Sequence, residues 1–288
     1  MLTTFIWGSA FVAQSAGSEH LEPFAFNGIR MLIGAAVLAP VIAVRSRRSS
    51  GSQSHDRKTL LRGGVLCGVL LFAASTVQQM GIEHTTAGKA GFITALYIVI
   101  VPLLGVFMKK KLPLRIWLGV VLALAGLYFL CITEDLSIGK GDLLVLCCAF
   151  FFSLHILVID KYSPVTDGLK LSAIQFVTAG ILSLPFMLIF ESPSLADIRA
   201  AALPLLYTGV LSCGVAYTLQ IIAQRDIAPE VASLLLSMES VFAVLTDWVV
   251  MSRGLSAREI CGCVLMFCAV ILAQLPSKAL SRIKGDKA

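Results

Sequence analysis

Ten apolar stretches, most about as long as a bilayer-spanning helix, occupy nearly all of this 288-residue chain. Apolar residues make up 57% of the sequence and charged residues only 14%, and the mean hydropathy is +0.88. One soluble core could not bury that much apolar surface, whereas lipid accepts it at about 20 residues per crossing. Backbone amides in hydrocarbon must bond internally, and the runs are too continuous for alternating barrel strands. The sequence therefore predicts an all-α polytopic membrane protein with ten transmembrane helices, near 1–17, 24–44, 60–81, 86–108, 114–131, 141–160, 170–190, 203–223, 229–250 and 257–275.

Basic residues gather in alternate loops between these stretches. With the N-terminus in the cytoplasm, 17 of the 23 Lys and Arg residues fall in inner loops and the C-terminal tail. Five fall in outer loops, and Arg30 lies inside a predicted helix. The positive-inside rule thus predicts a multi-pass protein of the cell membrane, in a bacterium the inner membrane, with both termini cytoplasmic. The run Lys109-Lys110-Lys111 anchors topology in this interpretation, so the net charge of +6 does not indicate a nucleic-acid partner.

The cysteines indicate neither a metal site nor a disulfide framework. All eight fall within apolar stretches, where a thiol behaves as a small hydrophobic group. No pair has zinc-ligand spacing with His or Cys partners in a polar loop. Nothing resembles a phosphate-binding loop, so the sequence predicts no cofactor and no ATPase motor within this chain.

The second half of the chain repeats the pattern of the first. Residues 86–130 realign with residues 229–273 at a constant offset of 143, which pairs Arg115 with Arg258. The earlier helices realign at an offset of 145. Identity between the halves is low, so the ordered pattern supports the repeat more than any single pair does.

Each half contains five predicted helices, and an odd number means that the second half enters the membrane from the opposite side. We therefore predict two inverted five-helix repeats, residues 1–131 and residues 141–288, the second with a short basic cytoplasmic tail. Inverted repeats recur in transporters, because one sequence plan yields two near-equivalent conformations that open to opposite sides. A tandem duplication without alternating access is the alternative.

Several short motifs, taken in order, resemble those of the drug/metabolite transporter superfamily, EamA type. They are Trp-Gly-Ser-Ala-Phe-Val at 7–12, Pro23 with Asn27 and Arg30, Thr-Ala-Leu-Tyr at 94–97 with Pro102, Gly119 with Gly126, and Leu-Ser-Met-Glu-Ser-Val-Phe-Ala at 236–243. The resemblance spans essentially the whole chain. Two turns depart from it, since residues 109–111 and 252–254 lack the acid of the family's Gly-Glu-Arg-like turn, and Ser240 stands where proline is frequent. The resemblance implies a central cavity built largely from helices one, three, four, six, eight and nine.

Polar and aromatic side chains inside the predicted helices are the candidates for a substrate site. An ionisable group at the bilayer centre costs about 2.5–3.5 kcal/mol on insertion scales, so its presence needs a reason. Glu239 could meet a substrate ammonium or carry a proton, Arg30 could bind a carboxylate, and His155 could shuttle protons. Each could instead hold neighbouring helices together. The predicted substrate-binding residues are Trp7, Gln14, Arg30, Gln78, Tyr97, His155, Tyr217, Gln220 and Glu239.

These features together favour a secondary transporter, a permease or exporter working by alternating access. The resemblance implies that its substrate is a small organic metabolite, such as an amino acid or related compound, or a drug. The expected partners are that solute, the lipid bilayer and, for coupling, protons, in a monomer or homodimer. A passive channel or a lipid-handling protein is the alternative, although a channel usually needs a continuous polar ring. A membrane-embedded enzyme is least favoured, since the sequence has no paired-acid, His-Glu-x-x-His or Gly-x-Ser-x-Gly signature.

Overall fold

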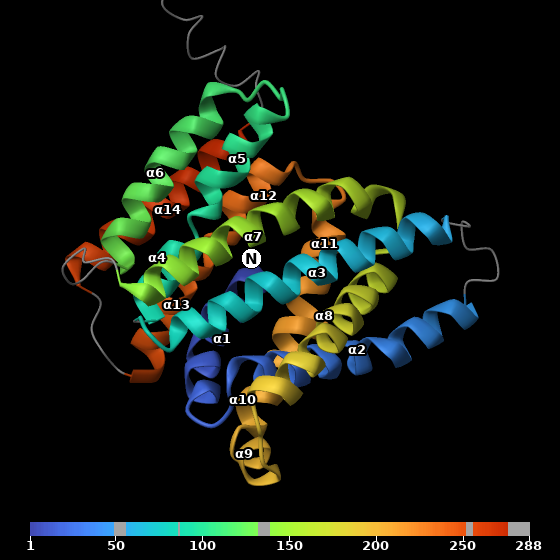
Figure 1. The fold of residues 1–288 in the computed structure, drawn as a ribbon. Coiled ribbons are helices and arrows are strands. Elements are labelled where there is room, and N and C mark those ends of the chain that lie inside the picture. The colour runs from blue at the N-terminus through green and yellow to red at the C-terminus, as the bar shows by residue number, and fades with distance from the viewer. Residues whose placement is uncertain (49–55, 86, 132–138, 252–255, 276–288) are drawn as a thin grey trace, which may run out of the picture.

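The structure, a computed structural model, describes residues 1–48, 56–85, 87–131, 139–251 and 256–275. Within these ranges the regular structure is helical and contains no strand, which confirms the predicted all-α class. The helices follow the apolar stretches in order (Figure 1). They are α1 (Leu2–Ser18), α2 (Pro23–Arg48), α3 (Arg57–Ile82), α4 (Ala87–Thr94), α5 (Tyr97–Phe107), α6 (Leu114–Cys131), α7 (Lys140–Tyr162), η1 (Ser163–Val165), α8 (Gly168–Phe190), α9 (Leu195–Ala200), α10 (Ala202–Leu206), η2 (Tyr207–Tyr217), α11 (Thr218–Gln224), α12 (Pro229–Leu236), α13 (Glu239–Met251) and α14 (Ala257–Gln274).

The lengths of these segments fit a polytopic membrane protein. In the described ranges, eight helical segments are long and apolar enough to cross a bilayer. The apolar helix Leu114–Leu130 and the 17-residue α1 are shorter, and they occupy the remaining two of the ten predicted positions. The chain is therefore a multi-pass membrane protein.

Two predicted helices are interrupted, which corrects the continuous ranges 86–108 and 229–250. The first divides into α4 and α5 at Ala95–Leu96, and the second into α12 and α13 at Ser237–Met238. At each division, N–H groups bond to carbonyl oxygens three residues back, as in a tight 3₁₀ turn. The sequence gives little warning, because neither division contains glycine or proline.

The predicted helix 203–223 also differs from a regular α-helix. Its central part, Tyr207–Tyr217, has π-helical hydrogen bonding and joins α10 to α11 without a break in the chain direction. The short helix α9 before it was not predicted. It begins with a capping box in which Ser194 and Asp197 each bond the other's backbone N–H.

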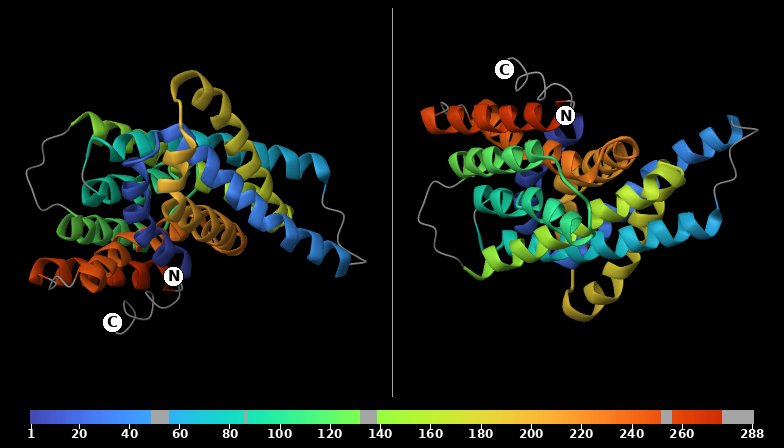
Figure 2. Two further views of the ribbon diagram at one scale, coloured as in Figure 1. Left: turned by 90° about the horizontal axis from the view of Figure 1, so that it is seen from below. Right: turned by 90° about the horizontal axis from the view of Figure 1, so that it is seen from above.

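Helices from the two halves of the chain pack against each other in matching pairs (Figures 1 and 2). α2 lies against α8, and α6 lies against α14 along one edge of the molecule. α1 packs on α13, as α7 packs on α4 and α5. α3 packs on α7 and α8, as η2 packs on α1 and α2. Each of these contacts made by a helix of one half thus has a counterpart made by the other half.

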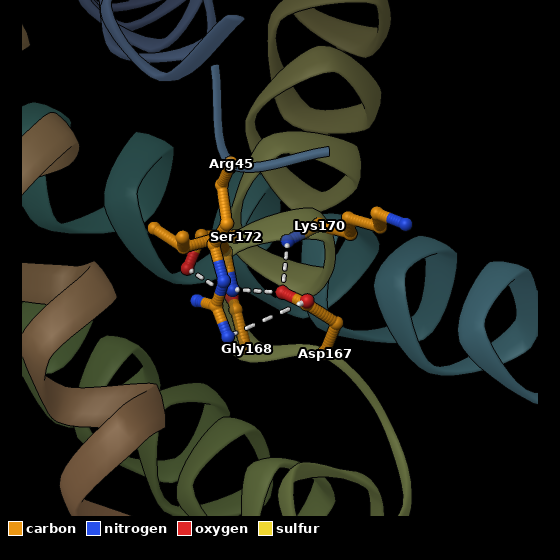
Figure 3. A network of polar contacts seen from close by, with 6 residues as sticks. Arg45, Asp167, Gly168, Lys170 and Ser172 are labelled. Carbon is orange, nitrogen blue, oxygen red and sulfur yellow. Dashed lines mark hydrogen bonds and ion pairs between the residues drawn. The ribbon is translucent and has the colours of Figure 1, made fainter. Parts of the chain in front are cut away.

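Polar contacts tie the antiparallel pair α2 and α8 together at both ends. At one end, the Asp167 carboxylate accepts hydrogen bonds from the backbone N–H of Leu169 (3.0 Å) and Lys170 (3.3 Å), which caps α8 (Figure 3). The same carboxylate lies 4.0 Å from the guanidinium of Arg45, near the end of α2. Because the Arg45 side chain is 60% exposed, this ion pair stabilises the fold little, and the cap is the stronger contribution.

At the other end, Glu191 follows the last residue of α8 and binds the start of α2. Its two carboxylate oxygens accept hydrogen bonds from the backbone N–H groups of Phe24 (2.7 Å) and Ala25 (2.6 Å). Burial raises the pKa of Glu191, while the two backbone hydrogen bonds act in the opposite sense. A carboxylate at this position satisfies N–H groups of the first turn that have no partner within the helix.

Candidate functional site

The two interrupted helices meet at a central cavity. α5 begins at Tyr97 and α13 begins at Glu239, and both side chains line the cavity. Thr94 and Leu236, which end the segments before the interruptions, line it as well. Discontinuous helices commonly form transporter sites, because their half-helix ends present partial charges and free backbone groups to a solute. A carboxylate in the first turn of α13 is also favourably placed in the field of that helix.

The cavity has an empty volume of about 520 Å³. This volume includes space that is open to solvent, so the lining residues, and not the volume, indicate what the cavity could hold. Helices one, three, four, six, eight and nine of the predicted ten all contribute to its lining, as the family resemblance implied. Arg30 adds a contribution from the second helix.

Arg30 is a buried cation with neutral partners. The residue is 3% exposed, and its guanidinium donates hydrogen bonds to Asn27 Oδ1 (2.8 Å) and Gln14 Oε1 (3.2 Å). Asn27 is fixed in turn by donating to the carbonyl oxygen of Ser75 (3.0 Å). In the described part of the chain, no carboxylate lies within ion-pair distance of Arg30. A buried charge is costly without an opposite charge, so the site is electrostatically suited to an anionic group of a ligand.

Glu239 is the acidic counterpart on the other half of the chain. It is 4% exposed, and Oε1 accepts a hydrogen bond of 3.0 Å from the Tyr97 hydroxyl. Over the residues that the structure describes, no cation lies within ion-pair distance of this carboxyl. The cavity therefore holds one basic and one acidic group that are not paired with each other.

The two charged residues of the cavity are not repeated in the other half of the chain. At the offset of 145, Trp7 corresponds to Phe152, and both rings line the cavity. Arg30, by contrast, corresponds to Gln175, and at the offset of 143 Glu239 corresponds to a leucine. Each charge therefore comes from one half alone. The cavity is thus polarised, with its basic and acidic groups fixed on different halves.

Aromatic rings form one wall of the cavity. The ring centres of Trp7 and Tyr217 lie 4.6 Å apart at an interplanar angle of 58°, and His155 meets Tyr217 edge-on at 6.0 Å. His155 is 1% exposed, and its Nε2 lies 3.0 Å from Gln175 Oε1 on α8. This contact gives His155 a fixed partner between helices, which is the packing role that the sequence left open beside proton transfer.

Two polar atoms in the lining residues remain without a partner. Gln78 donates to the Thr94 hydroxyl (3.2 Å), and Gln220 donates to Gln224 Oε1 (2.9 Å). Trp7 Nε1 and Gln220 Oε1, however, are buried and make no hydrogen bond to the described residues. Because buried polar atoms are usually satisfied, these two are a candidate donor and a candidate acceptor for a bound solute.

All nine residues predicted from the sequence line this one cavity. Their role in substrate binding stays a prediction. The sequence reading missed Thr94, Ser212 and Phe152, which also line it. Phe152 could have been found from its correspondence with Trp7 at the offset of 145. Thr94 could have been found from its place in the Thr-Ala-Leu-Tyr motif at 94–97, whereas Ser212 carried no signal, because hydroxyl side chains are common in membrane helices for packing reasons.

The described residues contain no group of three or more His, Cys, Asp or Glu arranged to hold a metal ion. The seven cysteines whose side chains are described are free thiols.

Known proteins resemble the chain over its full described length. A sequence model of the EamA-like transporter family matches residues 1–132 and 139–275. An uncharacterized transporter of Archaeoglobus fulgidus is 32% identical over 275 residues, which cover 95% of this chain and 84% of that protein. The uncharacterized transporter YoaV of Bacillus subtilis is 24% identical over 279 residues, 93% of each chain. The uncharacterized inner membrane transporter YedA of Escherichia coli is 25% identical over 281 residues, 94% of this chain and 87% of that protein.

A solved crystal structure of another protein shares the fold. It superposes with a TM-score of 0.78 at 19% sequence identity, covering 97% of this chain and 96% of that one. At this identity the likeness concerns the fold alone.

Proposed function

Because the chain belongs to the EamA-like transporter family, we propose that it is a secondary transporter that moves a small organic solute by alternating access. In this proposal, residues 1–131 and 141–288 are inverted repeats that rock around the central cavity. The observation that carries the proposal is a cavity between the two halves that contains an unpaired Arg30 and an unpaired Glu239. Such a space has the charges to hold a solute, and it lies where transporter sites commonly form.

Reciprocal contacts between α6 and α14 support the inverted relation of the halves. Arg115, the second residue of α6, donates to the carbonyl oxygen of Leu275 at the end of α14. Arg258, the second residue of α14, donates to the carbonyl oxygen of Tyr128 near the end of α6 (3.3 Å). Arg115 and Arg258 correspond at the offset of 143, and a two-fold axis between the helices produces this kind of exchange.

The closest backbone contacts between α6 and α14 are also related by an exchange of the two halves. A Cβ on Gly126 would lie 2.9 Å from the carbonyl oxygen of Gly262, and a Cβ on Gly119 would lie 3.3 Å from that of Ala269. At the offset of 143, Gly119 corresponds to Gly262 and Gly126 to Ala269. The two-fold axis that exchanges Arg115 and Arg258 therefore also exchanges these two contacts. This supports a single two-fold axis running between α6 and α14.

The charges in the cavity define the proposed substrate as a zwitterion such as an amino acid or a related compound. Its carboxylate would accept hydrogen bonds from the Arg30 N–H groups that Asn27 and Gln14 leave free. Its ammonium group would meet Glu239, and its apolar part would lie against the aromatic wall. Because the two charges come from different halves, the substrate would bind in one orientation and would contact both moving parts.

Ligand-induced stabilisation of the purified protein tests the substrate class. Each of the common L-amino acids would be added, and every compound that raises the melting temperature would be compared with its amide and its N-acetyl derivative. A ligand that binds only the folded state stabilises it by RT ln(1 + [L]/Kd). We expect stabilisation by the zwitterion and its loss in both derivatives, each of which lacks one charge. Equal stabilisation by either derivative, or none by any amino acid, would contradict the proposed class.

Counterflow in proteoliposomes tests the residues. We expect Arg30→Gln and Glu239→Gln each to slow uptake about tenfold or more, since a lost charge-assisted hydrogen bond costs about 1.5–3 kcal/mol. Arg45→Gln is the matched control, because it removes a cation from the same helix at a position 60% exposed. Normal transport by Glu239→Gln at equal protein level would make that acid structural.

The same preparation distinguishes the other functions. Flux that never saturates with substrate would indicate a channel, and product formation without vectorial movement would indicate an enzyme. Proton coupling through Glu239 predicts that an imposed pH gradient drives uptake in the wild type and not in Glu239→Gln. Lipid-handling activity would appear as movement of labelled lipid in the absence of solute.

The proposed location is a bacterial inner membrane with both termini in the cytoplasm, following the distribution of basic residues. Reporter domains fused to each end test the orientation, and two ends on opposite sides of the membrane would contradict the five-plus-five arrangement. Mass measurement of the purified protein distinguishes a monomer from a homodimer.

A further inference from the structure

A cluster of three charged residues joins the two halves of the chain beyond one end of the cavity. Lys110 Nζ lies 3.6 Å from Asp160 Oδ2 and 3.7 Å from Glu230 Oε1. Lys110 follows the end of α5, Asp160 lies in the last turn of α7, and Glu230 lies in the first turn of α12. The lysine belongs to the first matched segment of the chain and the acids to the second. One side chain of the first half thus connects two helices of the second.

The cluster lies just past the cavity along two helices. Asp160 is four residues beyond the lining residue Ile156 on α7, and Glu230 is six residues before Leu236 on α12. At 1.5 Å per residue these separations are about 6 Å and 9 Å along the helix axes. Leu234, which is fully buried, lies between the charges and the cavity on α12. The contacts of Lys110 therefore hold α5, α7 and α12 together where they enclose this end.

Glu230 needs the positive charge of Lys110 more than Asp160 does, because Glu230 is the more deeply buried of the two acids. Its side chain is 6% exposed, and its Oε1 makes no hydrogen bond to the described residues. Gly105 leaves the space that this oxygen occupies, since a Cβ there would lie 3.1 Å from it. A buried carboxylate without a cation is strongly unfavourable, whereas an exposed one is hydrated. Separating Lys110 from Glu230 is therefore coupled to letting water reach this end of the molecule.

The geometry of the lysine suits a contact that forms and breaks. Both nitrogen–oxygen distances exceed hydrogen-bond length, and one flexible ammonium serves two acids. An arginine held bidentately by one carboxylate would be harder to release.

We propose that Lys110, Asp160 and Glu230 form a gate that holds this end of the cavity closed and separates when it opens, an inference that rests on the proposed alternating access. Opening at this end requires α5 to move away from α7 and α12, which breaks both ion pairs. The positions that correspond to the two acids, at the offsets of 145 and 143, are Ser15 and Ala87. The opposite end therefore cannot form the same contact, and the gate favours one of the two conformations.

Thiol labelling in sealed vesicles tests the gate. Ile156→Cys places a thiol in the cavity beneath the cluster, and a charged, membrane-impermeant methanethiosulfonate is added from the side of Lys110. Labelling of the parent chain gives the background from native cysteines. We expect Lys110→Met to raise the labelling rate of Ile156→Cys about fivefold or more, in the range usual for coupling between conformation and binding.

Lys111→Met is the matched control, because Lys111 is an exposed neighbour of the same type in the segment between α5 and α6. Lys110→Arg, which keeps a cation between the two acids, is expected to leave labelling near the rate of Ile156→Cys alone. Equal labelling in the Lys110→Met and Lys111→Met backgrounds would overturn the gate. So would a Lys110→Arg variant that labels as fast as Lys110→Met.

A second measurement keeps the test independent of the stability of Lys110→Met. Bridging Lys110→Cys and Glu230→Cys with a bifunctional methanethiosulfonate is expected to join the segment after α5 to α12 and to block labelling of Ile156→Cys from this side. Reduction, which cleaves the bridge, is expected to restore the labelling. Continued labelling of the cross-linked protein would also overturn the gate. Because labelling reports opening and not transport, its outcome is separate from that of counterflow, which tests the proposed function itself.

Discussion

Tyr97 donates its hydroxyl hydrogen to Oε1 of Glu239 across 3.0 Å, joining the first residue of α5 to the first residue of α13. The two helices belong to different halves of the chain, so the bond closes the cavity wall where the halves meet. It also gives the buried acid one hydrogen-bond donor without neutralising it. An incoming ammonium group would therefore find a carboxylate that is oriented but still lacks a cation.

Removing the Tyr97 hydroxyl is expected to weaken substrate binding and leave the aromatic packing intact. Tyr97→Phe deprives Glu239 of its donor, and the loss of a hydrogen bond to a buried carboxyl costs about 1–3 kcal/mol. The measurement is a double-mutant cycle of Tyr97→Phe with Glu239→Gln, using the free energy of unfolding in one detergent and the apparent Kd for substrate. Additive effects on both quantities would show that the two side chains do not act through each other.

Gly8 controls how closely α1 approaches the start of α13. A Cβ at this position would lie 2.5 Å from the carbonyl oxygen of Glu239 and 2.7 Å from the backbone nitrogen of Ala243. Gly8→Ala is thus expected to push the two helices apart and displace the Glu239 backbone, with transport falling at least about tenfold. Counterflow normalised to folded protein checks this. The control is Ser15→Ala, which lies at an exposed position of the same helix and adds no atoms. Unimpaired transport by Gly8→Ala would show that the backbone of α13 can shift without affecting the substrate site.

The positions of the helices and the residues of the cavity were largely predictable, for a specific physical reason. Charged and amide side chains are rare in apolar helices, so Arg30, Glu239 and Gln220 stand out individually. These side chains meet in one cavity if the ten helices simply pack with their polar faces toward the centre of the bundle. The apolar stretches themselves follow from the length of a bilayer crossing, which fixes positions to within a few residues.

The features that escaped prediction depend on contacts between distant residues. The breaks at Ala95–Leu96 and Ser237–Met238 contain no helix-breaking residue, whereas Pro102 and Pro185 lie inside continuous helices. Tertiary packing therefore decided the breaks where local propensity did not. The lysine run after α5 was interpreted as a topology anchor, and Lys110 in addition reaches Asp160 and Glu230, which no local pattern reveals.

Gly262 allows the close contact of α14 with α6, and its substitution is expected to be destabilising. A Cβ at Gly262 would lie 2.7 Å from the Leu130 side chain and 2.8 Å from the carbonyl oxygen of Gly126. Because backbone atoms cannot move aside readily, Gly262→Ala should lower the free energy of unfolding by about 1–3 kcal/mol. Gly91→Ala is the control, since no heavy atom lies within 4 Å of a Cβ there. It should be neutral or stabilise the helix by up to about 1 kcal/mol. Thermal unfolding of both variants in the same detergent checks the ordering, and a reversed order would contradict the predicted crowding.

Lys109 adopts a left-handed backbone conformation, with φ of 62°, directly before the gate residue Lys110. Its N–H bonds to the carbonyl oxygen of Val106 (2.8 Å), and that of Lys110 bonds to the carbonyl oxygen of Gly105 (3.0 Å). This is the Schellman pattern of helix ends, in which the left-handed residue is usually glycine. A residue with a Cβ is destabilised by about 1–2 kcal/mol in this conformation. Glycine avoids that strain, but part of the gain is lost because glycine makes the unfolded chain more flexible. Lys109→Gly is therefore expected to raise the free energy of unfolding by about 0.5–1 kcal/mol, and Lys109→Val, which adds a β-branch, to lower it. Thermal unfolding measures both.

The turn keeps its hydrogen bonds in Lys109→Gly, so labelling of Ile156→Cys should stay at the rate seen with Lys109 in place. A faster rate would mean that the strained lysine itself, and not the turn, holds Lys110 between the two acids.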